Sequence, residues 1–439
     1  MFHKPASLQT KEHKIVPFSN EQEYLFEWCD TQTLRQNSPE FLGLHKRPEG
    51  FAPSSFIGAI WLGKEENRIP LIVRSKFPQM DYMSMYLACA EDPVVGYHLG
   101  ECFHFWPEQP LIEAEDLPRL SELLIAAFLR ELNELCSRHL RKHFERETNN
   151  LQGKVKGKIL LHAQVKQNLV HGRNDRVFCS YQVINDDIAE NRALRAALEQ
   201  SAKFINAKLD PYGKFSVLNR WIHSSRSALS GVSVVKVNRA DFRNLRSRGS
   251  FLHYSRALEL AKFVLLRLGA DPHAEIKQEN IVATPPFAIN SAELFERYTE
   301  KVLREKHAML EAGYEDKDTY GDKEGFNVRV RPDFWVSETS NKPAKIFDAK
   351  YKSIKDERNP KPLQTDIFQV VSYSRHESFI SKRLKCTNTD NIELALVYPN
   401  FEQQEEIKEI KTDNSFLSPL KMLFVKCPAI KKEIIREAA

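Results

Sequence analysis

The pattern of apolar and polar residues divides the chain into a β-rich beginning, a helical middle and a mixed end. Up to about residue 115, short apolar stretches are separated by Gly, Pro and Asn, which is typical of strands joined by turns. These predicted strands cover residues 56–61, 69–73 and 97–106. From Leu117 onward the apolar residues recur every three or four positions, which predicts a long amphipathic helix.

Helical patterns continue through the middle of the chain. Residues 191–209 and 251–268 each carry an apolar stripe at helical spacing, and a glycine follows the second stretch directly. A further helix is predicted from Ser291, as its N-cap, to about Leu310.

The C-terminal part alternates between strand and helix patterns. Residues 326–331 alternate apolar and polar side chains, as a half-buried strand does, and residues 345–351 predict a second strand after a polar turn. Residues 392–398 and 422–425 predict later strands of the same sheet. We therefore predict a multidomain α/β protein. Its parts are a β-rich N-terminal domain over 1–115, a candidate for partner docking, a mainly helical domain over 116–285, and a mixed sheet flanked by helices over 286–439.

Composition narrows the class of protein without naming it. Hydrophobic residues make up 42% and charged residues 28% of the chain, which describes a globular protein and not a disordered one. No apolar run approaches the roughly 18–20 residues that span a bilayer, and the first residues lack the apolar segment of a secretory signal. We expect a cytoplasmic protein without a membrane partner. The net charge of +5 is a mild bias that is compatible with a polyanionic partner.

Two common site types are missing from the sequence. The seven cysteines, at positions 29, 89, 102, 136, 179, 386 and 427, form no CxxC pair, which argues against a disulfide framework or a zinc ribbon. The phosphate-binding pattern GxxxxGK followed by Ser or Thr does not occur either, because the Gly/Lys-rich stretch at 153–158 is followed by Ile159. We expect no NTPase site in this chain.

The strongest candidate chemistry lies on the two predicted strands of the C-terminal part. Pro332 cannot donate to a strand ladder, so Asp333 is expected at a strand end or bend. Residues two apart in a strand share a face at roughly 6–7 Å, so Asp348 and Lys350 project together. Carboxylates that hold a hard cation suit phosphodiester hydrolysis, because the cation offsets charge on the phosphoryl oxygens.

These residues predict a metal-dependent site. Asp333 and Asp348 are candidate ligands of Mg²⁺, for which Mn²⁺ is a candidate substitute, and the main-chain carbonyl of Ala349 is a candidate third ligand. Lys350 would orient the attacking water, help to deprotonate it, or steady the pentavalent centre.

Two helices offer further polar groups. Gln369 and Tyr373 stand four residues apart on one face of a helix for which Thr365 is the predicted N-cap, and they could reach the metal-bound water or a phosphate. On the preceding helix either Glu293 or Glu296 could add a carboxylate, and we favour Glu296.

Each of these residues also has an ordinary structural interpretation. An Asp–x–Lys pair on a strand can be a solvated ion pair, a glutamate on a helix face usually meets water, and Gln369 with Tyr373 could simply pack a helix on a sheet. The combination of Pro-Asp, Asp-x-Lys and Gln-x-x-x-Tyr favours a catalytic site.

A basic cluster in the middle of the chain is a second candidate contact surface. Its members surround a single acid, Asp241, and they are Lys236, Arg239, Arg243, Arg246 and Arg248. With Phe242 and Phe251 nearby, the cluster could grip DNA phosphate or contact a protein partner. A solvated surface explains it equally well, and the sequence leaves both interpretations open.

The candidate site matches the PD-(D/E)xK nuclease signature through Pro332-Asp333, Asp348-Ala349-Lys350 and Gln369-x-x-x-Tyr373. The sequence from about residue 110 to the C-terminus also resembles the McrC family, the nuclease subunits of McrBC-type modification-dependent restriction systems. The residues that carry this second resemblance are Gly157-Lys-Ile-Leu-Leu-His162, Gln167-Asn168, Arg176-Val-Phe-Cys-Ser-Tyr181, Asp187 and Glu190-Asn191-Arg192-Ala193-Leu194.

The resemblance implies a restriction-endonuclease-like fold for the C-terminal domain and a Mg²⁺-dependent DNA endonuclease subunit. It implies docking onto a ring of McrB, an AAA+ GTPase that this subunit stimulates, with DNA cut when translocating complexes meet. Recognition of the modified base and nucleotide hydrolysis would belong to the partner, and GTP or ATP stays open. Two alternatives remain: a solitary repair nuclease of the PD-(D/E)xK type, and a noncatalytic adaptor that activates a motor NTPase.

Overall fold

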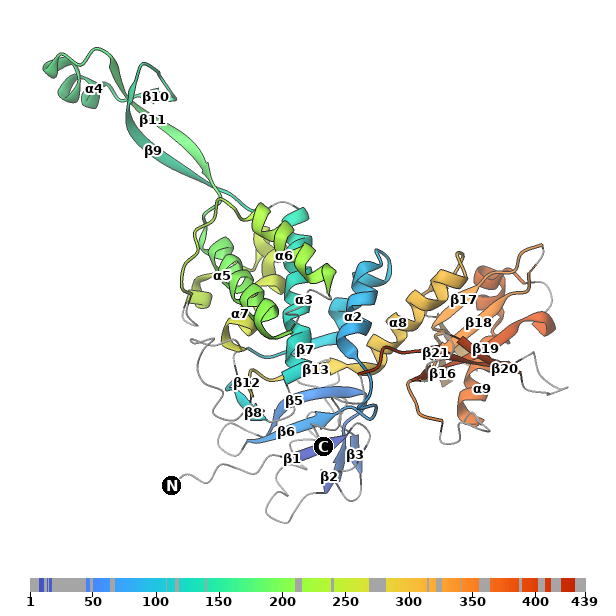
Figure 1. Ribbon diagram of the computed structural model, residues 1–439. Coiled ribbons are helices and arrows are strands. Elements are labelled where there is room, and N and C mark those ends of the chain that lie inside the picture. The colour runs from blue at the N-terminus through green and yellow to red at the C-terminus, as the bar shows by residue number, and fades with distance from the viewer. Residues whose placement is uncertain are drawn as a thin grey trace, which may run out of the picture. The chain divides into compact units, whose positions relative to one another are not determined.

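The computed structural model of the chain groups its residues into two compact units, Met1–Leu123 with Lys277–Ala439, and Leu124–Ile276 (Figure 1). The predicted division into three domains stays a prediction. The structure describes residues 8–11, 14, 16–17, 45–47, 50–63, 68–107, 109–114, 118–138, 140–209, 215–237, 241–267, 282–313, 316–320, 326–340, 342–354, 364–386, 389–401, 407–411 and 420–430.

The N-terminal region is built on a five-stranded sheet in the order β1-β6-β5-β13-β7, in which β1 runs parallel to β6 and the other pairs are antiparallel. The strands are β1 (Leu8–Lys11), β5 (Phe56–Leu62), β6 (Ile69–Arg74), β7 (Phe103–Phe105) and β13 (Phe287–Asn290). Two small sheets accompany it, formed by β2 (Val16–Pro17), β3 (His45–Arg47) and β4 (Gly50–Ala52), and by β8 (Ile112–Ala114) and β12 (Val282–Thr284). The predicted strands at 56–61 and 69–73 are confirmed.

Helical segments interrupt this region where the sequence analysis expects strands. The strand predicted over residues 97–106 is wrong for most of its length, because Val95–Cys102 form the 3₁₀ helix η2 before the short strand β7. The sequence analysis also misses α2 (Tyr82–Glu91), whose N-cap Asp81 accepts from the backbone N–H of Ser84 at 3.1 Å. Most buried residues of α2 share one face, but apolar residues also occupy its other sides, so the sequence lacks the one-sided apolar stripe that predicts a helix.

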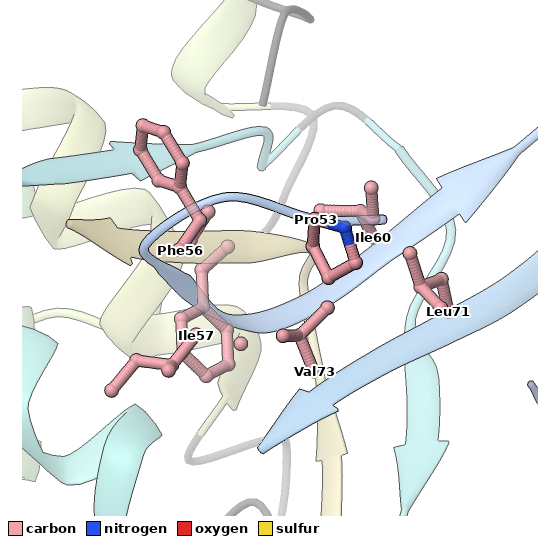
Figure 2. A pocket seen from close by; sticks show the side chains of 9 residues that line it. Pro53, Phe56, Ile57, Ile60, Leu71 and Val73 are labelled. Carbon is pink, nitrogen blue, oxygen red and sulfur yellow. The ribbon is translucent and has the colours of Figure 1, made fainter. Parts of the chain in front are cut away.

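Gly58 allows β5 to approach β13 closely. Its φ is +143°, and a Cβ at this position would lie 2.3 Å from the carbonyl oxygen of Phe287. Beside it lies an apolar cavity of about 10 Å³, whose lining includes Ile57, Leu71 and Val73 (Figure 2). A cavity of this size holds one water molecule at most, so it is a packing gap and not a ligand site.

The second unit is helical apart from one long arm. Its α-helices are α3 (Pro118–Ser137), α5 (Ala189–Phe204), α6 (Ser216–Ala228) and α7 (Ser255–Arg267). Helix α3 begins in the first unit, and α5 continues as the π-helix η4 (Ile205–Leu209). Two short 3₁₀ helices, η5 (Asp241–Asn244) and η6 (Gly249–Tyr254), precede α7. The helices predicted from Leu117, over 191–209 and over 251–268 are thereby confirmed.

The arm is a departure from the mainly helical prediction. β9 (His143–Gln152) pairs antiparallel with β11 (Arg176–Asn185), and the far end carries β10 (Lys158–Ile159), α4 (Leu161–Gln167) and the 3₁₀ helix η3 (Leu169–His171) (Figure 1). Most side chains of the ribbon are exposed or half-buried on both faces. The sequence therefore lacks the alternation of a one-sided sheet, which is the signal on which strand prediction depends.

Hydrogen bonds fasten the arm at its root. The side-chain amide of Asn191 donates to the carbonyl of Arg141, before β9, at 3.1 Å and to that of Asp186, after β11, at 2.8 Å. The hydroxyl of Tyr254 donates to Asn191 Oδ1 at 3.0 Å. The Glu-Asn-Arg run that carries part of the family resemblance thus joins the two ends of the arm to α5.

A second network fastens the far end of the arm. Asn168 is buried there, and its amide donates to Asn150 Oδ1 at 2.9 Å and to Gln164 Oε1 at 2.8 Å. The amide of Asn150 donates back to Asn168 Oδ1 at 2.9 Å. Because an isolated two-stranded ribbon is marginally stable in water, these buried bonds help to give the tip a defined shape.

The C-terminal region is a six-stranded mixed sheet in the order β14-β17-β18-β19-β21-β20, which confirms the predicted fold class. Its strands are β14 (Glu311–Ala312), β17 (Phe334–Val336), β18 (Lys345–Ala349), β19 (Glu393–Asn400), β20 (Ile407–Lys411) and β21 (Leu420–Lys426). β18, β19 and β21 run parallel, and the remaining pairs are antiparallel. The strand predicted over 326–331 is present as β16 (Phe326–Val330), but it pairs with β15 (Asp316–Tyr320) in a separate sheet.

Two helices cover the sheet through separate apolar clusters. On one side, Val302 and Leu303 of α8 (Ser291–Lys306) pack with Phe347. On the other, Val370 of α9 (Gln364–Tyr373) packs with Ile346. Because successive side chains of β18 point to opposite faces, Asp348 lies on the same side as Ile346, towards α9.

The predicted N-caps of these two helices are wrong. Asn290, and not Ser291, caps α8, because its side chain accepts from the backbone N–H of Glu293 at 3.1 Å. Ser291 is the first helical residue, and its hydroxyl donates to the carbonyl of Ser55 at 2.9 Å. Thr365 lies inside α9, which begins at Gln364. Among the described residues, no helix is long and apolar enough to cross a membrane.

Candidate active site

The structure brings Asp333 to the end of β18, where the sequence analysis expects it. Asp333 follows the buried Pro332 in a bend and precedes β17, which pairs antiparallel with β18. Its Oδ2 atom accepts a hydrogen bond of 2.6 Å from the backbone N–H of Ala349. This bond holds the side chain of Asp333 against the main chain of Ala349, which directly follows Asp348. All three residues are predicted metal ligands.

Asp348 and Lys350 form an ion pair that α9 holds in place. Asp348 is 1% exposed, and its Oδ2 atom contacts the ammonium of Lys350. That ammonium also donates to Gln369 Oε1 at 2.8 Å, and the amide of Gln369 donates to the hydroxyl of Tyr373 at 2.8 Å. The predicted residues Gln369 and Tyr373 are therefore brought to the site, where they form a chain of hydrogen bonds that orients Lys350.

Burial and mutual repulsion make the carboxylates of this site hard to ionise together. The pKa of Asp333 is raised well above its ordinary value, first by burial and then by the charges of Asp348 and Glu296. Burial also raises the pKa of Asp348, against the opposing charge of Lys350. For Glu296, burial raises the pKa to about 7, while Arg297 acts in the opposite direction. Asp333 thus feels the negative charges of both Asp348 and Glu296.

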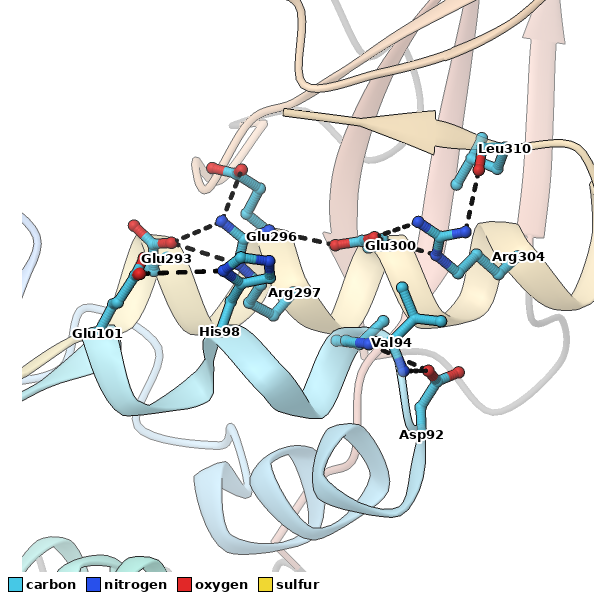
Figure 3. Close-up of polar contacts among 11 residues, drawn as sticks. Asp92, Val94, His98, Glu101, Glu293, Glu296, Arg297, Glu300, Arg304 and Leu310 are labelled. Atoms are coloured by element: carbon cyan, nitrogen blue, oxygen red, sulfur yellow. Dashed lines mark hydrogen bonds and ion pairs between the residues drawn. The ribbon is translucent and has the colours of Figure 1, made fainter. Parts of the chain in front are cut away.

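An ion-pair ladder along α8 supports Glu296 (Figure 3). Arg297 lies 3.8 Å from Glu296, 2.8 Å from Glu293 and 3.2 Å from Glu300, and Arg304 lies 2.7 Å from Glu300. Glu293 is held by the guanidinium of Arg297 through two nitrogens, whereas Glu296 acts on Asp333. Of the two glutamates that the sequence offers, Glu296 stays the favoured candidate, because its charge helps to raise the pKa of Asp333.

The sequence analysis misses a second lysine–carboxylate pair. Lys352 donates to Asp366 Oδ1 at 2.7 Å, and Asp366 is buried in the first turn of α9, where its charge raises the pKa of Asp348. The signal was present in the sequence. Lys350 and Lys352 are two residues apart, and Asp366 and Gln369 are three apart on one helix face, so one face of α9 engages both lysines.

The oxygen groups of this site fit a hard divalent cation. Within the part of the chain that the structure describes, no three or more His, Cys, Asp and Glu side chains are grouped so that they could hold a metal ion. Mg²⁺, however, is usually bound through one or two carboxylates and keeps several waters. Asp348 supplies a buried carboxylate and Asp333 a half-buried one, and a cation would relieve their repulsion. Asp366 Oδ2 is a buried atom without a hydrogen-bond partner among the described residues.

The basic cluster of the second unit contains one arginine with a clear structural task. The main chain and guanidinium of Arg246 donate to the buried Glu190 at 3.0 and 2.9 Å, and the guanidinium lies 4.3 Å from the ring centre of Phe251. Lys236, Arg243 and Arg248 are exposed, whereas Arg239 lies outside the described residues. A DNA or partner contact by this cluster stays a prediction.

Asp333, Asp348 and Lys350 thus lie together at the end of β18, and Gln369 reaches Lys350 from α9. That these residues form a PD-(D/E)xK nuclease site stays a prediction. A family model described as McrBC 5-methylcytosine restriction system component matches residues 107–399. Because this match spans more than half of the chain, the protein belongs to that family. Comparison with curated proteins finds no match.

Two solved structures similar to this chain contain proteins of Thermococcus gammatolerans. One is the refined half-complex from the tetradecameric assembly of Thermococcus gammatolerans McrB AAA+ hexamers with bound McrC, with 13% identity, a TM-score of 0.42, and coverage of 96% of this chain and 94% of that one. Another is the cryo-EM structure of the Thermococcus gammatolerans McrBC complex, with 14% identity, a TM-score of 0.33, and coverage of 68% and 87%.

The raised pKa of Glu296 predicts a pH-dependent stability. The group binds its proton more tightly in the folded state, so its contribution is fully present below its ordinary pKa of 4.5 and is lost as pH rises through about 7. Without divalent cations, we expect the free energy of unfolding of the wild type to fall by on the order of 2 kcal/mol relative to that of Glu296→Gln across this pH range. Thermal unfolding at a series of pH values measures the difference. Glu305→Gln, at a 58% exposed position of the same helix, is the control. Plots of stability against pH that stay parallel for the wild type and Glu296→Gln would contradict the expectation.

Proposed function

We propose that this chain is the Mg²⁺-dependent DNA endonuclease subunit of a McrBC-type restriction system, which cuts DNA in complex with an AAA+ GTPase that it stimulates. The observation that carries the proposal is the pairing of a buried carboxylate, Asp348, with the half-buried Asp333, beside a lysine that Gln369 holds in place. A structural ion pair alone would need neither the second carboxylate nor the hydrogen-bond chain from α9.

Asp333, Asp348 and the carbonyl of Ala349 would hold the cation. Mg²⁺, when bound, offsets the negative charge that gathers on the phosphoryl oxygens during hydrolysis. Glu296 adds negative potential at Asp333. Because its carboxylate also interacts with Arg297, we expect Glu296 to accept a hydrogen bond from a water on the cation and not to bind the cation directly. The hydrogen bond from Ala349 N–H fixes Asp333 and so reduces the reorganisation that binding requires.

Lys350 stabilises charge in this arrangement and does not act as the base. As an ammonium paired with Asp348 it has donors only, so it cannot accept a proton from water. It can donate to a phosphoryl oxygen or to the attacking water, while Gln369 keeps the ammonium directed. Water then adds to phosphorus and loses a proton to solvent, the bond from phosphorus to one ester oxygen breaks, and that departing oxygen takes up a proton from solvent.

Membership of the family supports an AAA+ partner, and the chain itself lacks the GxxxxGK[ST] pattern of an NTPase. The arm of the second unit offers a surface for such a partner. Its tip exposes aliphatic side chains that a monomer would ordinarily bury, among them Leu161 at 74%, Val170 at 73% and Leu169 at 52% exposure. The exposed lysines 154, 156 and 158 belong to the same end of the arm, so a partner site that is apolar with acidic edges would fit the tip.

Loss of either central residue should abolish cleavage. We expect Asp348→Ala and Lys350→Ala each to lower the Mg²⁺-dependent cleavage rate at least about a thousandfold, because charge stabilisation at the phosphate is the largest catalytic contribution. Plasmid DNA with and without modified bases is the substrate, and the chain is assayed alone and with its AAA+ partner plus GTP or ATP. Lys382→Ala, at an exposed position of the same domain, should cut like the wild type.

Each other outcome selects an alternative. Cleavage by the chain alone, without partner or nucleotide, would favour a solitary nuclease. Stimulated NTPase activity with no cleavage by the wild type would favour the noncatalytic adaptor. Full cleavage by both variants would reject the site itself.

The arm tip should be required for stimulation of the partner. We expect Leu161→Ser combined with Val170→Ser to lower the stimulated GTPase rate at least about tenfold, because exposed apolar residues at the centre of an interface carry much of its binding energy. Melting temperature should stay unchanged, since both side chains are exposed. Val234→Ser, at a 63% exposed position of the same unit, is the matched control. Equal stimulation by the tip variant and this control would exclude docking through the tip.

A further inference from the structure

Tyr351 directly follows Lys350, and residues from the N-terminal region fix its side chain. Its ring is 6% exposed and lies edge-to-face against Phe77, with ring centres 5.0 Å apart. The ammonium of Lys76 lies 4.1 Å from the centre of the same ring. Phe295 of α8, next to Glu296 in the sequence, contacts it from another side at 5.7 Å. Tyr351 thus packs against two separate parts of the chain.

A chain of hydroxyl groups continues from this ring into the N-terminal region. The hydroxyls of Tyr351 and Tyr82 are buried and lie 2.6 Å apart. The hydroxyl of Tyr82 also contacts that of Ser75, and Ser75 Oγ accepts from the backbone N–H of Phe77 at 2.9 Å. Hydrogen bonds that share members in a buried setting reinforce one another, so this chain is stiffer than separate bonds would be.

Main-chain contacts join the same two regions a second time. The backbone N–H of Asp81 donates to the carbonyl of Pro428 at 2.9 Å, and that of Ile430 donates to the carbonyl of Gln79 at 2.9 Å. Met80 and Ala429 form an antiparallel bridge between these bonds. Residues 79–81 are therefore held beside the end of β21. Tyr82, the first residue of α2, follows them directly.

The main chain at Lys350 is held on both of its sides. The backbone N–H of Lys350 donates to the carbonyl of Val397 at 2.7 Å, which continues the parallel pairing of β18 with β19. Immediately after it the chain turns, and the N–H of Lys352 donates to the carbonyl of Lys350 at 2.7 Å. Regular pairing ends here, so the packed side chain of Tyr351 adds a constraint on the turn that separates the two lysines.

We propose that Tyr82 and Tyr351 are positioning residues for the cleavage proposed above, on which this inference rests. Their paired hydroxyls connect the N-terminal region to the turn after β18 and help to fix this turn. The turn in turn sets the direction of the Lys350 and Lys352 side chains. Neither tyrosine needs to touch DNA. Loss of one hydroxyl leaves the rings packed but frees the turn, and small displacements of a catalytic group are costly in rate.

Single-turnover cleavage of DNA by the full chain with its partner tests this proposal. We expect Tyr82→Phe and Tyr351→Phe each to lower the rate constant about tenfold, with unchanged DNA affinity and unchanged reaction amplitude. The double variant should be no slower than either single variant, because one break already disconnects the chain of hydroxyls. A merely structural defect would lower the amplitude and leave the rate constant of the folded fraction unchanged.

Tyr298→Phe is the matched control, because this tyrosine of α8 also loses one hydroxyl contact, to the carbonyl of Lys426, and should cut at the wild-type rate. Wild-type rate constants in Tyr82→Phe and Tyr351→Phe would overturn the inference while leaving the proposed nuclease intact. Hydrogen exchange decides the inference even if the wild type cuts no DNA. Residues 346–354 should exchange faster in Tyr82→Phe than in the wild type and in Tyr298→Phe, and equal exchange would overturn the proposal.

Discussion

The end of β18 is shaped by the repulsion between carboxylates that are buried together. Asp348 is almost fully buried, Asp333 is held against the same strand, and Glu296 adds a third negative potential. Unpaired charges of like sign are among the costliest groups to bury, so such an arrangement persists only where something offsets it. Within the chain, Lys350 supplies part of that offset, and in the proposed function a bound cation would supply the remainder.

The surrounding fold can be understood from this constraint. β17 delivers Asp333, β18 delivers Asp348 and Lys350, and the parallel partner β19 fixes the backbone beneath them. α9 lies on the face to which Asp348 points, and it engages both lysines of the strand end. α8 covers the opposite face and positions Glu296 with its ladder of arginines and glutamates. The N-terminal region reaches the same point through Tyr82, so the site draws on both ends of the first unit.

The sequence predicts elements well where one face of a regular element is buried. Strands β5, β6, β18, β19 and β21 and helices α3, α5, α7 and α8 follow from periodicity for that reason. Periodicity is uninformative for α2, which is apolar nearly all round, and for the arm, which is exposed on both faces. The N-caps at Ser291 and Thr365 were assigned to residue types that suit a cap, but a one-residue shift decides such contacts and composition cannot resolve it.

The same limit applies to the site. The spacing of Asp348 and Lys350 is enough to place both on one face, and the Pro-Asp bend places Asp333. The pairing of Tyr351 with Tyr82 depends on how distant segments pack, so local patterns leave this contact unresolved. Arg246 illustrates the converse, since a basic run indicates phosphate binding, yet this member of the run holds Glu190.

The central claim is that Asp333, Asp348 and Ala349 receive a divalent cation at which a DNA phosphate is cut. A crystal structure of the chain with duplex DNA and Ca²⁺, a hard cation that commonly binds such sites without supporting cleavage, tests it most directly. The account predicts a cation bound by both carboxylates and the Ala349 carbonyl, with a phosphate oxygen within hydrogen-bond reach of Lys350. DNA bound elsewhere on the chain, with no cation between Asp333 and Asp348, would contradict it.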